Sequence, residues 1–137
     1  MNHRGPNYLP IVNRGAFVVG GTLHNSGTIR NDYGGVFTVL QSAEVVGAGS
    51  HSQAQSSTHV DDVLNARSLL FVNGRLTGSG SLVGTVTSRS AIVAPGNSPG
   101  ILTIDGRLTA SGSLFEIERA SPALADQVHV TGAASFN

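Results

Sequence analysis

The sequence predicts an all-β protein built as a solenoid of short, stacked strands. Three observations lead to this prediction: short runs of β-branched and aromatic residues, frequent glycine, and an internal repeat. The 137 residues include 18 glycines, and glycine inside a helix costs roughly 1 kcal/mol relative to alanine. Short strands separated by turns therefore suit this composition better than helices do. An antiparallel β-sandwich is the alternative, because alternating apolar and polar residues occur in both architectures.

Six short runs are expected to form strands, because they are β-branched or aromatic and most are bounded by turn-forming residues. They are Ala16–Val19, Val36–Leu40, Leu69–Val72, Ile101–Ile104, Leu114–Glu118 and Gln127–Val130. The last three alternate between apolar and polar residues, which predicts one inward and one outward face. The predicted inward pairs are Leu102 with Ile104, Phe115 with Ile117, and Val128 with Val130.

The segments around these runs complete the expected organisation. Residues 1–10 are expected to be disordered, residues 11–74 to form loosely repeated rungs, and residues 75–137 to form a more regular repeat. The stretch His51–His59 is predicted to be a surface loop within the first set of rungs. It is almost entirely polar, with Ala54 as its single apolar residue.

An internal repeat supports the solenoid more strongly than any single strand does. The frame G-x-L-x-x-S-G-[ST]-[LI] occurs three times, at Gly21–Ile29, Gly74–Leu82 and Gly106–Leu114. Asn73-Gly74 and Asp105-Gly106 open two of the copies, and alone each dipeptide would suggest a type I′ hairpin. In a repeated frame they equally form corners of a solenoid, where glycine supplies positive φ. Apolar residues between the corners would then pack from rung to rung.

Composition and charge exclude several classes of function. Eight basic and eight acidic side chains give a formal net charge of zero, whereas nucleic-acid binding needs a net basic face. The sequence contains no cysteine, which excludes disulfides, zinc–thiolate sites and thiol catalysis. No apolar run approaches the roughly 18 residues that span a bilayer. The first six residues also lack the apolar core of a signal peptide.

The region from Arg75 to Asn137 resembles a known bacterial repeat. Its submotifs occur in order: Gly78–Gly84, the core Ala94–Gly100 with its strand, the acidic strand Leu114–Glu118, and Ala125–Gly132. This arrangement is similar to the autotransporter-associated β-strand repeat of passenger regions in bacterial type V secretion. The motif positions are Pro95, Gly96, Asn97, Ser98, Pro99, Gly100, Leu102, Ile104, Gly106, Asp126 and Gly132.

The resemblance implies a right-handed parallel β-helix on the bacterial surface, in the outer membrane or secreted. The implied role is structural: a stalk or scaffold that supports outer-membrane translocation and display, with no catalytic activity, cofactor or metal. The family also implies a C-terminal translocator barrel, which is expected to lie outside this chain, so that the chain is a fragment. Unpaired strand edges at the ends of such a fragment predict self-association.

The segment Gly96-Asn97-Ser98-Pro99-Gly100 also has the form G-x-S-x-G, the nucleophile elbow of α/β-hydrolases. In that site the residue after the serine donates its backbone N–H to the oxyanion, and Pro99 has no N–H. The elbow also opens a helix, whereas Ile101–Ile104 is predicted to be a strand. The sequence therefore predicts a turn at the end of a β-helix rung here.

Two groups of titratable side chains could in principle carry chemistry. Glu116 and Glu118 share one strand face, with about 7 Å between their Cα atoms. This spacing could in principle mimic the pair of carboxylates in a glycosidase. A solvated outer face is the prediction, with Arg119 or a neighbouring rung supplying a cation. The second group gathers the histidines and aspartates nearest in sequence. It has no known metal-ligand spacing and is predicted to be solvated; its members are His51, His59, Asp61 and Asp62.

Two functions from other classes stay open beside the structural role. An adhesin module would bind a host-surface or glycan ligand, with the loop His51–His59 as the expected contact, because long excursions carry binding. A polysaccharide-active β-helix enzyme would need Asp, Glu, Arg and His side chains clustered on one wall. The sequence alone offers only isolated candidates for such a cluster.

Overall fold

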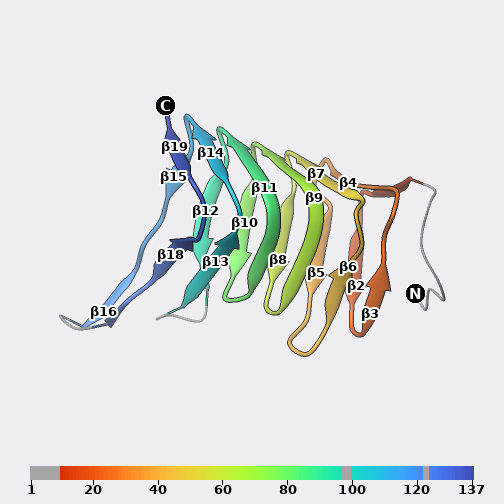
Figure 1. Ribbon diagram of the computed structural model, residues 1–137, viewed down its shortest axis with the longest axis horizontal. Helices are drawn as coiled ribbons and strands as arrows, with labels where there is room; N and C mark the ends of the chain where they lie inside the picture. The colour runs from red at the N-terminus through yellow and green to blue at the C-terminus, as the bar shows by residue number, and fades with distance from the viewer. Residues whose placement is uncertain (1–9, 97–99, 122–123) are drawn as a thin grey trace.

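The computed structural model describes residues 10–96, 100–121 and 124–137, and in them the chain is a parallel β-helix of about five turns. Strands of successive rungs lie side by side along one axis (Figure 1). Residues that pair between neighbouring rungs are separated in the sequence by 17 to 26 residues. Arg75 and Ile92 are among the pairs with the shortest separation, and Leu108 and Ala134 are among those with the longest. The predicted solenoid is confirmed. The described residues form no helix and therefore contain no apolar helix long enough to cross a membrane.

The strands form three faces, here called A, B and C, which the chain visits in that order in every rung. Face A contains β1 (Ile11–Asn13), β4 (Thr28–Asp32), β7 (Ser50–Ala54), the second halves of β9 (Val63–Val72) and β11 (Ser81–Arg89), β14 (Leu108–Ser111) and β19 (Ala134–Phe136). Face B contains β2 (Ala16–Val19), β5 (Val36–Val39), β8 (Ser57–Val60), β10 (Arg75–Gly78), β12 (Ile92–Pro95) and β15 (Leu114–Phe115). Face C contains β3 (Thr22–His24), β6 (Glu44–Val46), the first halves of β9 and β11, β13 (Ile101–Asp105) and β18 (Gln127–Val130).

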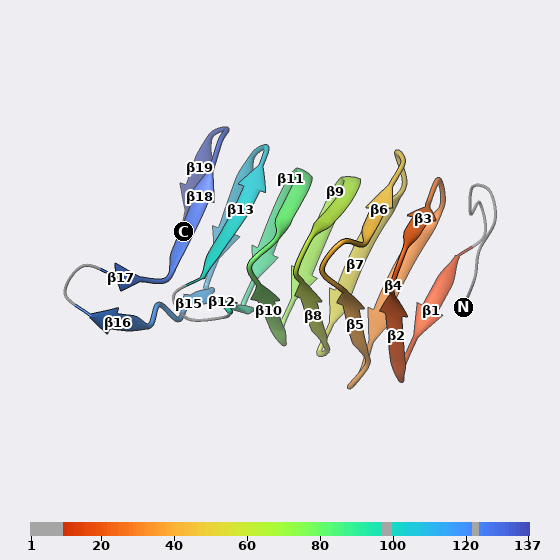
Figure 2. The ribbon, with the colours of Figure 1, turned by 90° about the horizontal axis from the view of Figure 1, so that it is seen from below.

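All pairings between rungs are parallel in the described part of the chain, so the antiparallel sandwich is wrong as an alternative. The one antiparallel pair there joins β16 (Arg119–Ser121) to β17 (Leu124–Ala125). This pair leaves the last rung between faces B and C and projects from the end of the solenoid (Figure 2). It is an excursion from the rung and does not interrupt the parallel ladders.

Inward side chains stack in rows, because parallel pairing sets equivalent positions of neighbouring rungs one above the other. One buried row on face C contains Leu23, Val45, Leu64, Leu82 and Ile104. On face B the rings of Phe17 and Phe37 stack with centroids 5.3 Å apart. Burial of each large apolar side chain contributes roughly 1.5–3 kcal/mol. The predicted inward positions of Leu102 and Ile104 are confirmed, since both are buried.

The other predicted inward pairs are only partly covered. Phe115, Val128 and Val130 pack against the core but stay half-buried, and Ile117 is 47% exposed, so its predicted burial is wrong. These residues line the open C-terminal end, where the described chain provides no further rung. The strand predicted over Leu114–Glu118 also ends early, at Phe115, because the chain then leaves the rung toward β16.

The segment His51–His59 is not a surface loop, which corrects the prediction. It forms β7 on face A and β8 on face B, joined by the corner at Gln55 and Ser56. Within these strands every second side chain points inward, and His51, Gln53 and Thr58 are buried. Polarity made the segment look like a loop, but its alternation is that of a strand whose inward polar groups bond to one another.

The repeated frame marks corners, and each copy turns a different one. Gly21–Ile29 connects face C to face A, through β3 and β4, whereas Gly74–Leu82 connects face B to face C, through β10 and β11. Gly106–Leu114 connects face A to face B, through β14 and β15. Asn73-Gly74 and Asp105-Gly106 are therefore corners between parallel ladders and not hairpins. Gly74 and Gly106 have φ of 74° and 151°, as expected of bends that require glycine.

Gly106 stands in a stack of glycines where successive rungs approach closely. A Cβ at Gly106 would overlap the carbonyl oxygen of Gly84, and one at Gly132 would crowd the carbonyl oxygen of Gly106. We therefore expect Gly106→Ala to lower the free energy of unfolding by more than about 1 kcal/mol. Gly21→Ala is the matched control, because nothing lies within 4 Å of a Cβ there. Equal urea midpoints for the two variants would contradict this close approach.

The buried row on face C predicts the cost of opening a cavity. Ile104→Ala is expected to lower the free energy of unfolding by about 2–5 kcal/mol, since the neighbouring rungs cannot collapse onto the space. Thr103→Ala, on the outward face of the same strand, is the control and should change it little. Urea denaturation followed by far-UV circular dichroism measures both, and a larger loss for Thr103→Ala would mean that the register is wrong.

Candidate functional site

Among the described residues, polar side chains gather inside the solenoid, on the outer surface of face B, and at the corner that carries Asp126. The interior group, here called the polar layer, consists of His51, Gln53 and Thr58. The Thr58 hydroxyl donates to Oε1 of Gln53 at 2.7 Å, and Nε2 of Gln53 donates to the carbonyl of Asn73 at 3.0 Å. His51 Nε2 lies 3.4 Å from the Thr58 hydroxyl oxygen. The layer thus satisfies most of its own hydrogen bonds.

The imidazole of His51 is an aromatic member of the core. Its ring centroid is 4.9 Å from that of Phe37 and 5.8 Å from that of Phe71. Because the Thr58 hydroxyl donates its proton to Gln53, Nε2 of His51 is the donor and Nδ1 carries no proton. Nδ1 has no hydrogen-bond partner among the described residues. Burial lowers the pKa of His51 from 6.5 to about 4, because a buried cation loses its hydration.

The polar layer predicts a loss of stability in mild acid. The pKa of His51 is about 4 in the folded chain, whereas an exposed histidine has a pKa of 6.5, so the unfolded chain binds more protons between these pH values. Stability therefore falls as the pH falls through this window, by at most about 1.4 kcal/mol per pH unit. Urea denaturation at pH 7 and pH 4.5 measures the loss. His51→Leu should reduce it, whereas the exposed control His129→Gln should not; identical losses in both variants would contradict the assignment.

The outer surface of face B holds a chain of three polar side chains that run across neighbouring strands. His59 on β8 contacts the Thr77 hydroxyl on β10 through Nδ1 at 2.7 Å, and Asp61 through Nε2 at 2.8 Å. The predicted solvated group of His51, His59, Asp61 and Asp62 does not stay together. His51 is buried inside the solenoid, which corrects the prediction, whereas the other three are half-buried. The structure adds Thr77, which sequence reasoning missed, because the register of β8 on β10 sets Thr77 directly beside His59.

A hydroxyl, an imidazole and a carboxylate in a row have the composition of a nucleophilic triad. Acyl transfer also needs N–H donors aimed at a developing oxyanion. The backbone N–H groups of Gly80 and Gly96 nearby donate to the carbonyls of Val60 and Gly78. Those donors are thus engaged in holding rungs together. The geometry of Thr77, His59 and Asp61 is that of a clasp between neighbouring rungs.

The glutamates of the predicted acidic strand lie at the edge of a shallow groove. Both carboxylate oxygens of Glu116 accept hydrogen bonds from the guanidinium of Arg75, at 3.2 and 3.3 Å. This bidentate ion pair reaches across β12. The cation of Glu116 therefore comes from the rung beyond the neighbouring one, on β10. Both side chains are exposed, and such a pair is worth about 0–1 kcal/mol. The groove, of about 270 Å³, is lined by these two residues with Thr77, Ala94, Pro95, Gly96, Glu118 and Asp126.

Asp126 is a buried carboxylate that joins three segments at one corner. Oδ1 accepts the backbone N–H of Gly100 at 2.8 Å, and Oδ2 accepts that of Glu118 at 3.0 Å. A Cβ at Gly100 would overlap the carbonyl oxygen of Gly96. The motif positions Gly96 and Gly100 thus meet Asp126, which lies 26 residues after Gly100 in the sequence. The buried carboxylate thus accepts two backbone N–H groups, those of Gly100 and Glu118, at the corner of the rung.

The other positions of the predicted repeat motif lie in the core, at the corners, or outside the residues that the structure describes. Pro95 ends β12 on its inward face, Leu102 and Ile104 are core, and Gly106 and Gly132 belong to the glycine stack. Asn97, Ser98 and Pro99 lie outside the described residues. The segment after them is strand β13, as predicted, where a hydrolase elbow would open a helix.

By its fold the chain is a β-solenoid protein of the parallel β-helix type. Comparison with protein-family models, curated proteins and solved structures finds no match to it. Within residues 10–96, 100–121 and 124–137, no group of three or more His, Cys, Asp or Glu side chains is placed to hold a metal ion. The functional argument therefore rests on the geometry of the solenoid itself.

Proposed function

We propose that the chain is a structural segment of a bacterial autotransporter passenger, a β-helical stalk that supports outer-membrane translocation and display at the cell surface. The observation that carries the proposal is the continuous interior of the parallel β-helix, in which each rung rests on the one before it. The ordered submotifs from Arg75 to Asn137 point the same way. The family would add a C-terminal translocator barrel as the partner in export.

A solenoid of this kind suits vectorial folding outside the cell. Each rung contacts only its neighbours, so the structure grows one rung at a time as chain emerges. Every new rung buries apolar residues such as Leu64 and Leu82 on the preceding one. That burial disfavours backward movement of the chain, since the last rung would have to unfold first. A chain without cysteine also forms no disulfide that could block passage through a narrow pore.

The contacts among the described residues weigh against the other two functions. The adhesin prediction placed its contact at His51–His59, which is built into faces A and B. The enzyme alternative needs Asp, Glu, Arg and His side chains clustered on one wall, and Arg75, Glu116, Glu118 and Asp126 do line one groove. On face B, Asp61 is engaged with His59 and Glu116 with Arg75. The structural role is the interpretation that these contacts favour.

Export can be tested with a display fusion in a Gram-negative host. The fusion places a signal peptide and an epitope before the chain and a translocator barrel after it. We expect the epitope to be cleaved by protease added to intact cells, and Leu69→Asp to reduce the cleaved fraction several-fold. Leu69 is buried in the core, whereas its neighbour Leu70 points outward on the same strand. Leu70→Asp is therefore the matched control.

The fraction of epitope at the surface is normalised to total fusion protein, so that degradation does not imitate a failure of export. Equal display by Leu69→Asp and Leu70→Asp, with the fold lost only in Leu69→Asp, would show that folding of this chain does not assist export. Retention of the unsubstituted fusion inside the outer membrane would also overturn the proposal.

A further inference from the structure

The charged side chains of this neutral chain are distributed unevenly over its three faces. Seven of the eight acidic residues lie on faces B and C or at the corners beside them: Glu44, Asp61, Asp62, Asp105, Glu116, Glu118 and Asp126. The eighth, Asp32, ends β4 on face A, and its side chain is 4% exposed. The outer surface of face A therefore presents little negative charge, although the formal net charge of the chain is zero.

Arginines are concentrated on and beside the same surface. Arg89 ends β11, and Arg107 directly precedes β14. Arg67 lies where β9 passes from face C to face A. All three residues are exposed, and none of them forms an ion pair with any part of the chain that the structure describes. Arg30 also belongs to this surface, but it pairs with Asp32 at 3.0 Å.

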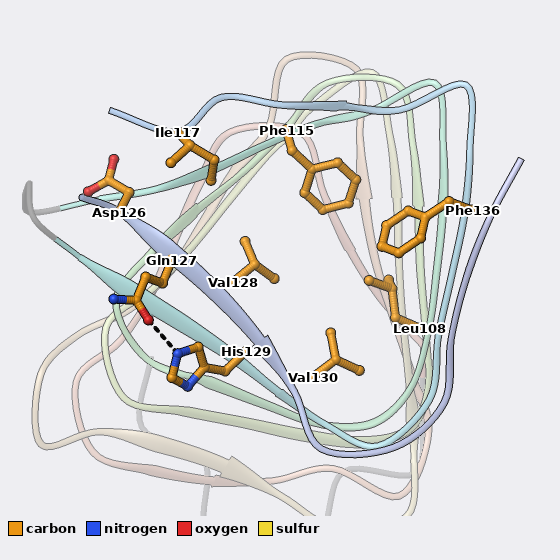
Figure 3. Close-up of a pocket in the computed structure, with 9 residues that line it drawn as sticks. All are labelled: Leu108, Phe115, Ile117, Asp126, Gln127, Val128, His129, Val130 and Phe136. Atoms are coloured by element: carbon orange, nitrogen blue, oxygen red, sulfur yellow. Dashed lines mark hydrogen bonds between the residues drawn. The ribbon is translucent and has the colours of Figure 1, made fainter. Parts of the chain in front are cut away.

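The direction of these side chains follows from the alternation of their strands. Figure 3 shows Leu108 pointing from face A into the interior, so its neighbours in the sequence, Arg107 and Thr109, point outward. The same alternation sets Arg89 outward at the end of β11. Asp105, at the end of β13, is the acidic residue closest to Arg107 in the sequence. Its carboxylate accepts a hydrogen bond from a threonine hydroxyl beside face C.

Hydroxyl groups cover most of the outer surface of face A between the arginines. Parallel pairing sets the outward residues of successive strands in rows, about 4.8 Å apart from strand to strand and about 7 Å apart along each strand. One row contains Thr28, Ser50, Ser68 and Thr85, and the next contains Ser52, Leu70, Thr87 and Thr109. Neither row contains an aromatic residue. The surface is thus a flat grid of hydroxyls with guanidinium groups at its margins.

We propose that the outer surface of face A binds a linear polysaccharide that carries carboxylate groups. The carboxylates pair with Arg67, Arg89 and Arg107, and the sugar hydroxyls exchange hydrogen bonds with serine and threonine, which both donate and accept. A guanidinium binds a carboxylate through two parallel N–H···O bonds. Arg75 already binds Glu116 in this way on face B. The three unpaired arginines offer the same contact to a carboxylate from outside.

The spacing of the arginines favours a sparsely charged chain over a nucleic acid. Arg107 is four residues from the register partner of Arg89 on the neighbouring strand, which puts the two Cα atoms about 14 Å apart. Duplex DNA carries one negative charge per about 1.7 Å of its axis, so most of its phosphates would meet no cation here. Single strands are bound on aromatic platforms, which the two rows lack. Acidic polysaccharides carry their charges at wider intervals, with hydroxyls between them.

This surface differs from the contact expected for an adhesin. Of the segment His51–His59, the outer surface of face A includes Ser52 and Ala54, and the arginines lie on later strands. The inference adds a binding surface to the folded solenoid and does not rest on the proposed role in export. A stalk without a ligand and a binding surface without export are both possible outcomes, and different experiments detect them.

Isothermal titration calorimetry of the 137-residue chain with carboxymethyl-dextran tests the proposal, with unmodified dextran as the uncharged probe. We expect binding to carboxymethyl-dextran that weakens as salt is added, and no binding to dextran. Arg107→Gln should raise Kd several-fold. Arg89→Gln together with Arg107→Gln should raise it about tenfold, which corresponds to about 1.4 kcal/mol.

Arg14→Gln is the matched control, because it removes the same charge from another exposed residue. Arg14 follows β1, five strand spacings or about 24 Å from Arg107 along the axis, so Kd should not change. Equal urea midpoints of all variants would show that each remains folded.

Four outcomes would overturn the proposal. Dextran could bind as well as carboxymethyl-dextran, or Arg14→Gln could weaken binding as much as Arg107→Gln, which would mean that net charge alone matters. Carboxymethyl-dextran could also fail to bind at about 1 mM, the weakest affinity worth a specific surface. Finally, duplex DNA at the same concentration of charge could bind more tightly than carboxymethyl-dextran, which would identify a nucleic-acid surface instead.

Discussion

Parallel backbone pairing between rungs is the constraint on which the rest of the structure depends. The N–H of Leu40 donates to the carbonyl of Val19, and the N–H of Asp61 donates to the carbonyl of Val39, so rung follows rung at a set register. Once this register is set, each side chain meets the residue of the same row above and below. Buried rows must therefore be compatible along the whole axis. The same register brings the backbone so close at some corners that only glycine fits.

The polar layer shows how this constraint is met without an entirely apolar core. His51 takes a place between Phe37 and Phe71 that an aromatic ring fills, while Gln53 and Thr58 turn their polar atoms toward each other. Burying such groups is tolerable because their hydrogen bonds are made within the layer and to the carbonyl of Asn73. The unpartnered Nδ1 of His51 is the exception among the described residues.

The sequence predicted the architecture well because alternation and glycine corners are local signals. Leu102 and Ile104 were expected inside from the pattern of one strand, and they are buried. The prediction of a surface loop at His51–His59 is wrong because hydrophobicity alone does not reveal that inward polar side chains hydrogen-bond to one another. Ile117 was misjudged because its burial depends on a neighbouring rung and not on its own strand. The clasp of Thr77, His59 and Asp61 likewise depends on register, which no single strand encodes.

The three copies of the glycine frame have a consequence for how such a chain can change length. Each copy encodes a strand, a corner and the next strand, yet the copies occupy different corners of the cross-section. The unit of sequence is thus two strands with the corner between them, although the unit of structure is a full circuit of three faces. A duplication of one such unit would rotate everything downstream by two faces while leaving every ladder parallel. A solenoid of this kind can therefore lengthen by fractions of a turn. Interior side chains would need to repack only where the duplicated strands contact the original ones.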